Sequence, residues 1–481
     1  MEILRKIIFI CVFSFPLIGI AQSTFYKKFT SGPFDQGFGI VQLPDSSYAI
    51  TGTSGGFNND SGQAFLMIID SLGNQKWTKN YGDFGEDIGM RVIHVPNDGF
   101  YIAGYTGSTA NGDFDFVLYK TDLSGNLQWE ETYGGADWDV LHDAALLDDG
   151  GLILVGETDG LLSQGKDVFM VRTDALGAEI WTKTIQTAED DFASSVLVLS
   201  PTEFVIGGNI GDFGISKGML ASYHVDGTEN WVEILDQAGV TKVNDMALDQ
   251  GIIYMAGYIK HPTENKNDFW YAKSDLNGNY VGQNFFQGYL SGGYYNSIAV
   301  SGNGVYLGML SDSPEINPYP GGLDAFVQLY SFSNIYEAGA TFSAFDEDMI
   351  NQLILTNDGG VAFVGTASDN PLNSSLGSNV MVAKLGANAE STPVADNGLD
   401  LVSLSTEEKK IISLYPNPTS SFINISSELD QKPFELRNIQ GKLVKSGNIS
   451  TKLSLSELKK GVYFLRIEDS NQLWSAKIIK N

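Results

Sequence analysis

The sequence has a single cysteine, Cys11, which lies inside the apolar run at the N-terminus. Without that run the chain has no thiol, which excludes a disulfide framework, a thiolate nucleophile and a cysteine-ligated metal. Segments with the 3.6-residue apolar period of an amphipathic helix are also lacking. No second apolar run follows the first, so we expect no transmembrane segment.

Basic residues are scarce over most of the chain. Residues 22–400 contain 15 Lys or Arg against 49 Asp or Glu, whereas residues 401–481 contain 12 against 8. Because binding to phosphates depends on Lys and Arg, we expect no nucleic acid partner for the acidic part. The change in the sign of the net charge indicates two separately used domains.

The N-terminus has the pattern of a secretory signal. Arg5 and Lys6 precede the apolar run, and Gly19, Ile20 and Ala21 follow it. The run is too short to span a bilayer comfortably. We therefore predict a signal peptide over residues 1–21.

A unit of about 52 residues recurs between residues 22 and 388. Each unit holds about four short apolar or alternating segments, separated by turns rich in Gly, Asn and Asp, which predicts four β-strands. A tryptophan marks the unit at Trp77, Trp129, Trp181 and Trp231. A glycine after an apolar run marks it seven times, at Gly52, Gly104, Gly156, Gly208, Gly257, Gly308 and Gly365. Seven units of four strands predict an all-β fold, a seven-bladed β-propeller.

Two further expectations follow from the repeat. The recurring glycine is expected where a strand nears the axis or carries a bulge, because a missing Cβ allows close backbone approach. The segment from Phe25 to Phe29 aligns with the strand at Trp77, and the seventh unit lacks that strand. The opening strand is therefore expected to complete the last blade.

An aspartate ladder runs through the repeat. Its members are Asp35, Asp87, Asp139, Asp191 and Asp348, and the fifth and sixth units align with Lys242 and Tyr295 at this position. A ring of carboxylates would bind Ca²⁺, which takes several oxygen ligands. The alternative is that each aspartate accepts hydrogen bonds from the amides of its own turn. The recurrence of the aspartate in most blades favours the structural role. The sequence identifies no cofactor other than Ca²⁺.

Other polar patterns carry less information. Asp115–Lys120, Asp167–Arg172 and Asp268–Lys273 are each five residues apart, so the two side chains lie on opposite faces of a strand and form no salt bridge within it. We expect a solvated or turn-bonding edge there. The histidines, His94, His142, His224 and His261, fall in four units and lack metal-ligand spacing. We assign no catalytic residue.

Aromatic residues in glycine-rich stretches favour a binding role. Tyr294 and Tyr295 lie in QGYLSGGYYNS, Tyr319 in SPEINPYPGGLD and Trp138 in GGADWDV. Rings with an apolar face and a polar edge suit sugars and protein loops alike. The predicted binding residues are Tyr294, Tyr295, Tyr319, Asp139 and Asp191. We predict a binding or adhesion module for glycan or protein; the alternative is a carbohydrate-active hydrolase or lyase that uses carboxylates on one face.

The propeller array resembles bacterial β-propeller repeats of the SBBP type. One copy of their pattern is matched by Trp129, Gly134, Gly135, Asp139, Gly151, Gly156, Thr158, Asp167, Arg172 and Asp174. That resemblance implies a fold and no reaction. A Gly-x-x-x-Trp element resembles the docking motif of quinoprotein propellers, and Asp122, Gly125 and Trp129 have the wrong spacing for a sialidase Asp box. Neither enzyme family is supported.

After a linker over residues 389–410, residues 411–481 read as a small β-sandwich. They contain Tyr415–Pro416–Asn417–Pro418, then Asn438–Ile439–Gln440–Gly441–Lys442, then Leu458 to Phe464, and they close with Lys477–Ile478–Ile479–Lys480. This order resembles the C-terminal sorting domain of the type IX secretion system. The resemblance implies the type IX translocon as a partner and a secreted or cell-surface location.

Overall fold

The computed structural model describes residues 24–31, 34–55, 62–82, 85–107, 113–159, 165–187, 190–211, 217–235, 241–260, 267–286, 293–311, 324–342, 348–368, 377–389, 410–411, 414, 419–425, 429, 431–438, 443–469 and 472–480. These residues form strands and turns, with no α-helix among them. The predicted signal peptide, Tyr319 and His261 lie outside the described residues.

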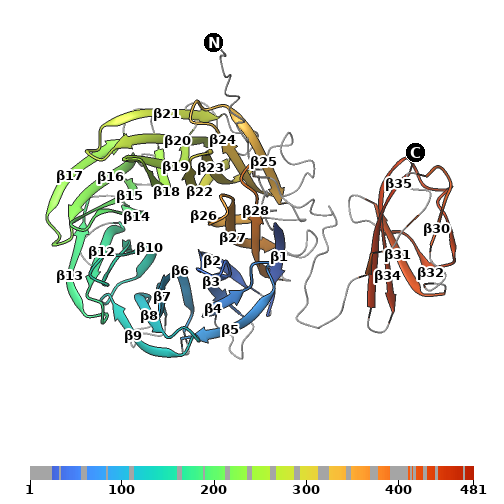
Figure 1. The fold of residues 1–481 in the computed structure, drawn as a ribbon, viewed down its shortest axis with the longest axis horizontal. Helices are drawn as coiled ribbons and strands as arrows, with labels where there is room; N and C mark the ends of the chain where they lie inside the picture. The colour runs from blue at the N-terminus through green and yellow to red at the C-terminus, as the bar shows by residue number, and fades with distance from the viewer. Residues whose placement is uncertain are drawn as a thin grey trace, which may run out of the picture.

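Seven four-stranded antiparallel sheets form a closed ring, as the repeat predicts (Figure 1). Blades one to four are β2 (Gln36–Gln42), β3 (Tyr48–Ser54), β4 (Gln63–Ile69), β5 (Gln75–Tyr81); β6 (Asp87–Val95), β7 (Gly99–Thr106), β8 (Asp115–Thr121), β9 (Leu127–Tyr133); β10 (Asp139–Leu146), β11 (Leu152–Thr158), β12 (Asp167–Thr173), β13 (Glu179–Ile185); and β14 (Phe192–Ser200), β15 (Glu203–Ile210), β16 (Lys217–His224), β17 (Glu229–Leu235).

The last three blades are β18 (Thr241–Asp249), β19 (Ile252–Lys260), β20 (Asn267–Asp275), β21 (Tyr280–Phe286); β22 (Gly293–Ser301), β23 (Gly304–Ser311), β24 (Asp324–Tyr330), β25 (Tyr336–Phe342); and β26 (Met349–Leu355), β27 (Val361–Ser368), β28 (Ser378–Leu385) with β1 (Phe25–Phe29). Strand β1 pairs with β28 from Phe25↔Lys384 to Phe29↔Val380, so the opening strand does complete the seventh blade. The ring is therefore closed by hydrogen bonds between the two ends of the repeat array.

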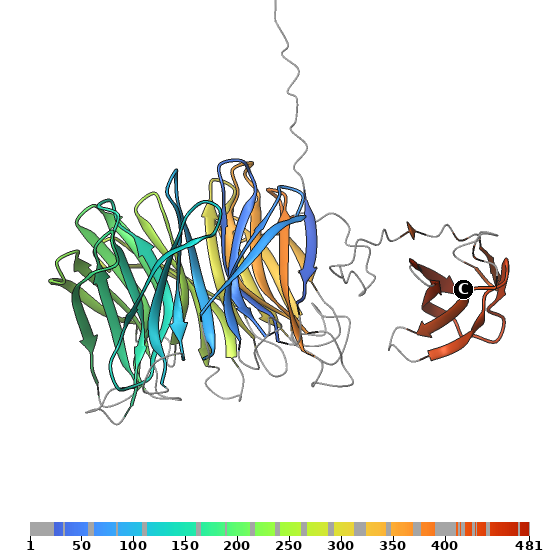
Figure 2. The same cartoon turned by 90° about the horizontal axis from the view of Figure 1, so that it is seen from below.

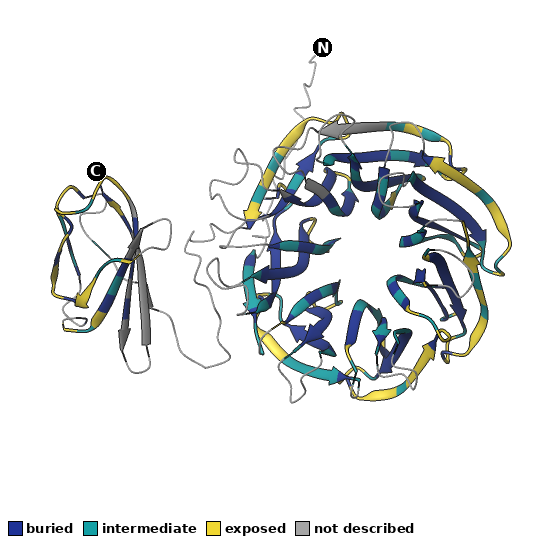
Figure 3. Ribbon diagram, turned by 180° about the vertical axis from the view of Figure 1, so that it is seen from behind, coloured by how far each residue is buried: buried dark blue, intermediate teal, exposed yellow. Residues whose placement is uncertain are grey.

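The strands of each blade run between two faces of the ring (Figure 2). We call the end where the innermost strands begin the ladder face, because the aspartate ladder lies there, and the opposite end the turn face. Buried residues fill the inner three strands of the blades, whereas the outermost strands carry most of the exposed residues (Figure 3). Side chains of adjacent blades interdigitate to form the core, as around Phe100, Ile102 and Val117.

The marker glycine faces a β-bulge, as the sequence suggested. The innermost strand of every blade has a register shift; in blade two it lies between Gly89 and Arg91. A Cβ on Gly104 would stand 1.8 Å from the Ile88 carbonyl oxygen, so no side chain fits. Equivalent clashes of 1.9–2.0 Å with main-chain oxygens exist at Gly52, Gly156, Gly208, Gly257 and Gly365.

The bulges correct the alignment of the fifth and sixth units. Measured from the bulge, the ladder position is Thr241 in blade five and Gly293 in blade six, not Lys242 and Tyr295. The Thr241 hydroxyl accepts a hydrogen bond from the Gly218 amide at 3.0 Å. In blades three and four the ladder residue that accepts an amide hydrogen bond is an aspartate. The sequence alignment of these two units rested on the spacing between the ladder residue and an apolar residue. That spacing gave the wrong position, because a bulge inserts a residue that the period of the sequence does not show.

The sixth blade also displaces the marker glycine by one residue. Gly308 pairs with Ser297 beyond the bulge, and Met309 stands opposite Tyr295. A Cβ on Gly308 would meet a side-chain methyl group of Ile350 at 2.9 Å, rather than a carbonyl oxygen. The seven repeats therefore share the same four strands, but they differ in the position of the marker glycine and in the residue at the ladder position.

Polar side chains connect the innermost strands from blade to blade. Arg91 Nε donates to Asp143 Oδ1 at 2.7 Å, and Asp143 Oδ2 accepts from the Val196 amide at 2.8 Å. Further along the ring, side chains of the bulge residues donate to the carbonyl oxygen before the next bulge: Ser194 to Val243, Asn244 to Tyr295, Asn296 to Ile350 and Asn351 to Gly37. These bonds satisfy carbonyl groups that the bulges remove from the hydrogen-bond pattern between strands.

The C-terminal domain encloses a core of its own. A five-stranded sheet contains β29 (Lys410–Ile411), β35 (Gln472–Lys480), β34 (Gly461–Asp469), β31 (Pro433–Asn438) and β32 (Leu443–Asn448), and a two-stranded sheet contains β30 (Phe422–Asn424) and β33 (Lys452–Ser454). Ile423 and Leu453 of the small sheet pack with Leu436, Leu465 and Ile478 of the large one. Two sheets over one apolar core make the small β-sandwich that the sequence predicts.

Candidate binding surface

Asp139, a predicted binding residue, is 2% exposed at the ladder face. Its amide donates to the Phe114 carbonyl oxygen of the preceding blade at 2.7 Å, and its carboxylate accepts from the Gly135 amide at 3.1 Å. Burial raises the pKa of Asp139 to about 6, against hydrogen bonds from Thr158 and Gly135. These contacts are the ones that the turn-bonding alternative predicts for the ladder.

Asp191 occupies the same position in the next blade and is fully buried. Its amide donates to the Lys166 carbonyl oxygen at 2.6 Å, and its Oδ1 accepts from the Gly211 amide at 2.9 Å. Within the described part of the chain, no three His, Cys, Asp or Glu side chains gather as they would around a metal ion. Calcium binding by the ladder stays a prediction.

Of the three predicted tyrosines, the structure describes the side chain of Tyr295 alone, because Tyr319 lies outside the described residues. Tyr295 is fully buried, and its ring packs 5.1 Å from that of Phe269 in the core. For Tyr294 the structure describes the backbone, which pairs with Leu310 in β23. Asp139 and Asp191 belong to blades three and four, far along the ring from blade six. Among the described residues, Tyr295 is therefore separate from Asp139 and Asp191, and a role for Tyr294 and Tyr319 stays a prediction.

The basic residues of two of the Asp–Lys/Arg pairs bond to turns rather than to solvent. Lys120 and Arg172 are each 3% exposed, so of the solvated or turn-bonding edge expected from the sequence the turn-bonding form is found there. Their partners are aspartates in the turn between the first and second strands: Lys120 Nζ lies 2.8 Å from Asp98 Oδ2, and an Arg172 nitrogen lies 2.5 Å from Asp149 Oδ2. The expected absence of a bridge to Asp115 or Asp167 agrees with these pairings.

The turn face holds a groove of about 360 Å³ between blades one and two. That volume is within the range of small-molecule sites. Its apolar lining includes Ile68, Trp77, Phe100 and the half-exposed Leu123, and its rim includes Asp45, Lys76 and His94. This groove was not predicted from the sequence.

A break in the repeat explains the groove. In blade two, Tyr101 packs against Trp129 with ring centroids 5.8 Å apart, and its hydroxyl donates to the Ala175 carbonyl oxygen at 2.9 Å. The strand pairing places Ala49 at the equivalent position of blade one. Blade one therefore has no tyrosine ring to pack on Trp77, a residue that lines the groove.

The polar groups at the rim of the groove have defined states. His94 packs 5.3 Å from the ring of Phe100, and burial lowers the pKa of its imidazole, an effect that Asp45 partly opposes. A lowered pKa keeps the imidazole neutral at pH 7, with one nitrogen as donor and the other as acceptor. Lys76 Nζ lies 3.4 Å from Asp45 Oδ2, and both side chains are exposed.

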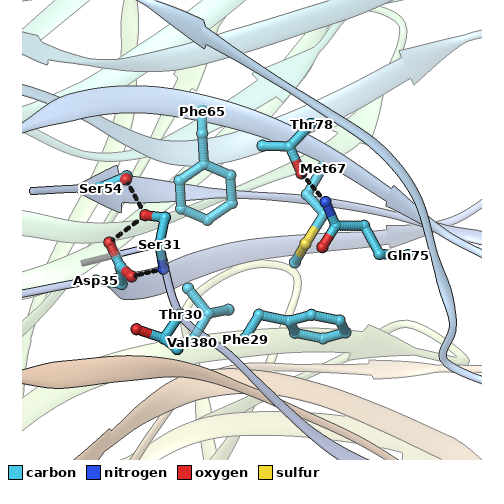
Figure 4. Close-up of a pocket in the computed structure, with 10 residues that line it drawn as sticks. All are labelled: Phe29, Thr30, Ser31, Asp35, Ser54, Phe65, Met67, Gln75, Thr78 and Val380. Atoms are coloured by element: carbon cyan, nitrogen blue, oxygen red, sulfur yellow. Dashed lines mark hydrogen bonds between the residues drawn. The ribbon is translucent and has the colours of Figure 1, made fainter. Parts of the chain in front are cut away.

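Two other features are weaker candidates. Trp138 is 54% exposed on the ladder face, where its ring contacts Phe114 edge-on at 4.9 Å. A pocket of about 40 Å³ lies at the seam between β1 and blade one, where Ser31 Oγ bonds Asp35 and Ser54 (Figure 4). That pocket holds a few water molecules at most, so it is too small for a ligand.

Comparison with known proteins identifies the tail. Residues 413–481 match the family described as the secretion system C-terminal sorting domain. The C-terminal domain is a type IX sorting domain. In this sorting domain the Tyr463 hydroxyl donates to the Lys459 carbonyl oxygen at 2.8 Å, and Lys480 Nζ donates to the Ser420 carbonyl oxygen at 2.6 Å. The LKKGVY and closing KIIK segments thus stabilise the turns beside them, and the domain directs the chain to the cell surface or the extracellular space.

The propeller is similar to solved structures at low sequence identity. BamB from Moraxella catarrhalis is 11% identical, with a TM-score of 0.39 over 76% of this chain and 98% of that chain. PorZ, a surface component of the type IX secretion system of Porphyromonas gingivalis, is 12% identical, with a TM-score of 0.38 over 91% of this chain and 58% of that chain. The propeller domain of the Trilobed protease from Pyrococcus furiosus is 9% identical, with a TM-score of 0.44 over 74% and 95%. At such scores a likeness carries no information about a ligand.

Among proteins with curated descriptions, none matches this sequence. No helix in the described ranges is long and apolar enough to cross a membrane.

Proposed function

We propose that the chain is a secreted binding module whose propeller takes a sugar unit of an extracellular glycan in the groove between blades one and two. The observation that carries the proposal is the groove itself, which exists because Ala49 replaces the tyrosine of the next repeat. The sorting domain supports the location at which such a ligand occurs.

The lining suits a sugar ring. Trp77 and the half-exposed Leu123 provide apolar surface, and a saccharide has C–H faces that pack against aromatic rings. Asp45 and the neutral His94 at the rim offer acceptors and a donor to hydroxyl groups. A mostly apolar groove with a few oriented polar groups is the usual form of a small-ligand site.

A hydrolase or lyase is less well supported. Asp139, whose pKa burial raises to about 6, is 2% exposed, so a substrate does not reach it in this structure. Glycoside hydrolysis needs two carboxyl groups on either side of the scissile bond. Asp45 is the acid that lines the groove, and its pKa is lowered, chiefly by the Ser47 hydroxyl, which does not suit a general acid.

The groove is tested by filling it with the residue of the next repeat. In Ala49→Tyr, we expect the new ring to occupy the groove and its hydroxyl to reach the Leu123 carbonyl oxygen, as Tyr101 reaches Ala175. Binding of the mature chain to immobilised neutral and uronic acid polysaccharides is measured together with the release of reducing ends. We expect retention without release, weakened at least about tenfold in Ala49→Tyr, which corresponds to about 1.4 kcal/mol.

Two variants separate binding from folding. Leu72→Tyr adds the same side chain at a site 60% exposed on the turn face, outside the groove lining, and should leave retention unchanged. His94→Leu installs the residue that blade three has at this position, Leu146, and should weaken retention without loss of thermal stability. Equal retention by wild type and Ala49→Tyr would refute the groove, and release of reducing ends would favour an enzyme.

A further inference from the structure

The ladder face brings carboxylates together in pairs. One residue at the start of the third strand in each blade, the first or the second of that strand, lies beside the ladder residue of the next blade. Both are aspartates at three junctions, as Asp115 with Asp139, Asp167 with Asp191 and Asp324 with Asp348. The other junctions hold no such pair, since they combine Gln63 with Asp87, Lys217 with Thr241, Asp268 with Gly293 and Asn379 with Asp35.

The pair between blades three and four is the most enclosed. Asp167 and Asp191 are both fully buried, and the 2.6 Å hydrogen bond from the Asp191 amide to the Lys166 carbonyl oxygen holds the two residues side by side. Asp167 Oδ2 accepts from Gln186 Nε2 at 3.0 Å, and Asp191 Oδ1 accepts from the Gly211 amide. The other oxygen of each carboxylate, Asp167 Oδ1 and Asp191 Oδ2, is buried without a hydrogen-bond partner.

Buried carboxylate oxygens normally have a donor or a cation, because desolvating an ionised group without either is costly. Lys166, next in sequence to Asp167, does not supply the charge, because its Nζ pairs with Glu157 Oε1 at 2.5 Å. Thr187 donates a hydrogen bond to the Asp191 carboxylate. Asp190 accepts from the Lys166 amide at 2.7 Å, so a further negative group lies nearby. Two orphan oxygens in such a setting point to a missing positive ligand.

The neighbouring pair between blades two and three differs. Asp115 Oδ1 and Asp139 Oδ2 both lie within 2.4 Å of the point where a Cβ on Gly134 would stand, which shows how closely such carboxylates approach. There, however, Asp139 Oδ2 accepts the Gly135 amide, and Asp115 is partly exposed to solvent. The pair with two buried and unsatisfied oxygens is the one at the junction of blades three and four.

We propose that Asp167 and Asp191 bind a divalent cation, Ca²⁺, at this junction. Ca²⁺ takes six to eight oxygen ligands, and two carboxylates leave the remaining positions to main-chain oxygens and water. In the described residues no third acidic or histidine side chain joins the pair, so the affinity belongs with the weak sites of extracellular modules, about 10⁻⁴ to 10⁻³ M. The sorting domain delivers the propeller to that compartment.

The test is calcium binding to the mature chain, measured by equilibrium dialysis with ⁴⁵Ca²⁺ and by thermal unfolding at pH 7. We expect saturable binding in the millimolar range and a midpoint several degrees higher in 10 mM CaCl₂ than in EDTA. Asp167→Asn and Asp191→Asn should each remove both effects. Amides occupy the position of Asp167 in blades one and seven, as Gln63 and Asn379, so the fold accommodates the change.

Asp268→Asn is the matched control. Asp268 holds the same strand position in blade five, but the ladder position beside it is Gly293 and no carboxylate pair exists. This variant should keep the calcium response of the wild type. Absence of saturable binding by the wild type, or a calcium response retained in both Asp167→Asn and Asp191→Asn, would overturn the proposal. In the first case a proton shared by the two carboxyl groups would account for the orphan oxygens. A negative result for calcium does not test the proposed glycan groove between blades one and two, because the two sites lie on opposite faces of the ring.

Discussion

A Cβ atom on Gly125 would stand 2.7 Å from Cζ3 of Trp77, the marker tryptophan of the preceding blade. The same contact recurs between Gly177 and Trp129, and between Gly278 and Trp231. Each glycine also has a positive φ, which is +74° at Gly125. The glycine of one Gly-x-x-x-Trp element therefore contacts the tryptophan of the preceding one, and the tryptophan packs on the turn of the following repeat.

Gly125→Ala should destabilise the propeller through both backbone and packing. Gly251→Ala is the matched control, because Gly251 has φ +77° and a Cβ there would meet nothing within 4 Å. Placing an L-residue at positive φ costs about 1–2 kcal/mol in each variant. The clash with Trp77 should add about 1–3 kcal/mol in Gly125→Ala alone. Urea unfolding of both variants measures the difference, and equal losses would show that the ring does not require the glycine.

Asp143→Ala should break the polar connection between blades two, three and four. The change leaves Arg91, whose side chain is 13% exposed, without its carboxylate and removes the acceptor of the Val196 amide. Loss of one partner of a buried ion pair costs about 3–5 kcal/mol. Lys76→Ala, which breaks the exposed pair with Asp45, should cost no more than about 1 kcal/mol. Chemical denaturation compares the two, and similar values would argue against a role for the inner ring.

Phe29→Ala should weaken closure of the ring. Phe29 is 9% exposed at the end of β1 and packs in the core shared by the first and last blades. Removing a buried phenylalanine side chain costs about 3–5 kcal/mol. Amide hydrogen exchange should rise first in β1 and β28, which pair at the seam. Phe34→Ala, at a residue 60% exposed, should be close to neutral; faster exchange spread evenly over all blades would contradict the seam as the weak point.

Asp139 should make the stability of the chain depend on pH. Its pKa is raised from 3.8 to about 6 by burial, so the folded state binds the proton more tightly than the unfolded state. This group therefore contributes stability that is present in full below about pH 4 and is lost as the pH rises through about 6. The difference in unfolding free energy between wild type and Asp139→Asn should shift by about 3 kcal/mol across that range. A pH-independent difference would show that Asp139 ionises normally.

Much of the architecture was readable from local pattern. A repeat with four alternating segments and Gly/Asn/Asp turns specifies strands and hairpins, and seven marker glycines specify the number of blades. Closure by Phe25–Phe29 was also predictable, because the last unit lacks a strand that the first supplies. The tail motifs identified the sorting domain, since their order and terminal position are specific.

The site residues were not readable in the same way. Tyr295 looked like a loop aromatic, but it lies in β22 at the buried position before the bulge that Leu141 and Val243 hold in their blades. The buried Lys120 and Arg172 each pair with an aspartate in a turn, Asp98 and Asp149, and spacing along one strand does not show such a contact.

By itself, therefore, the sequence determined the strands, the seven blades, the closing strand and the export domain, because these follow from short-range period and from motifs that repeat. Only the tertiary structure decided which repeats differ in space. The absence of one ring at Ala49 becomes a groove only when blade two stands beside it, and Asp167 and Asp191 become a pair only across a junction. Packing between blades, rather than the pattern within any one of them, sets where a ligand is able to bind.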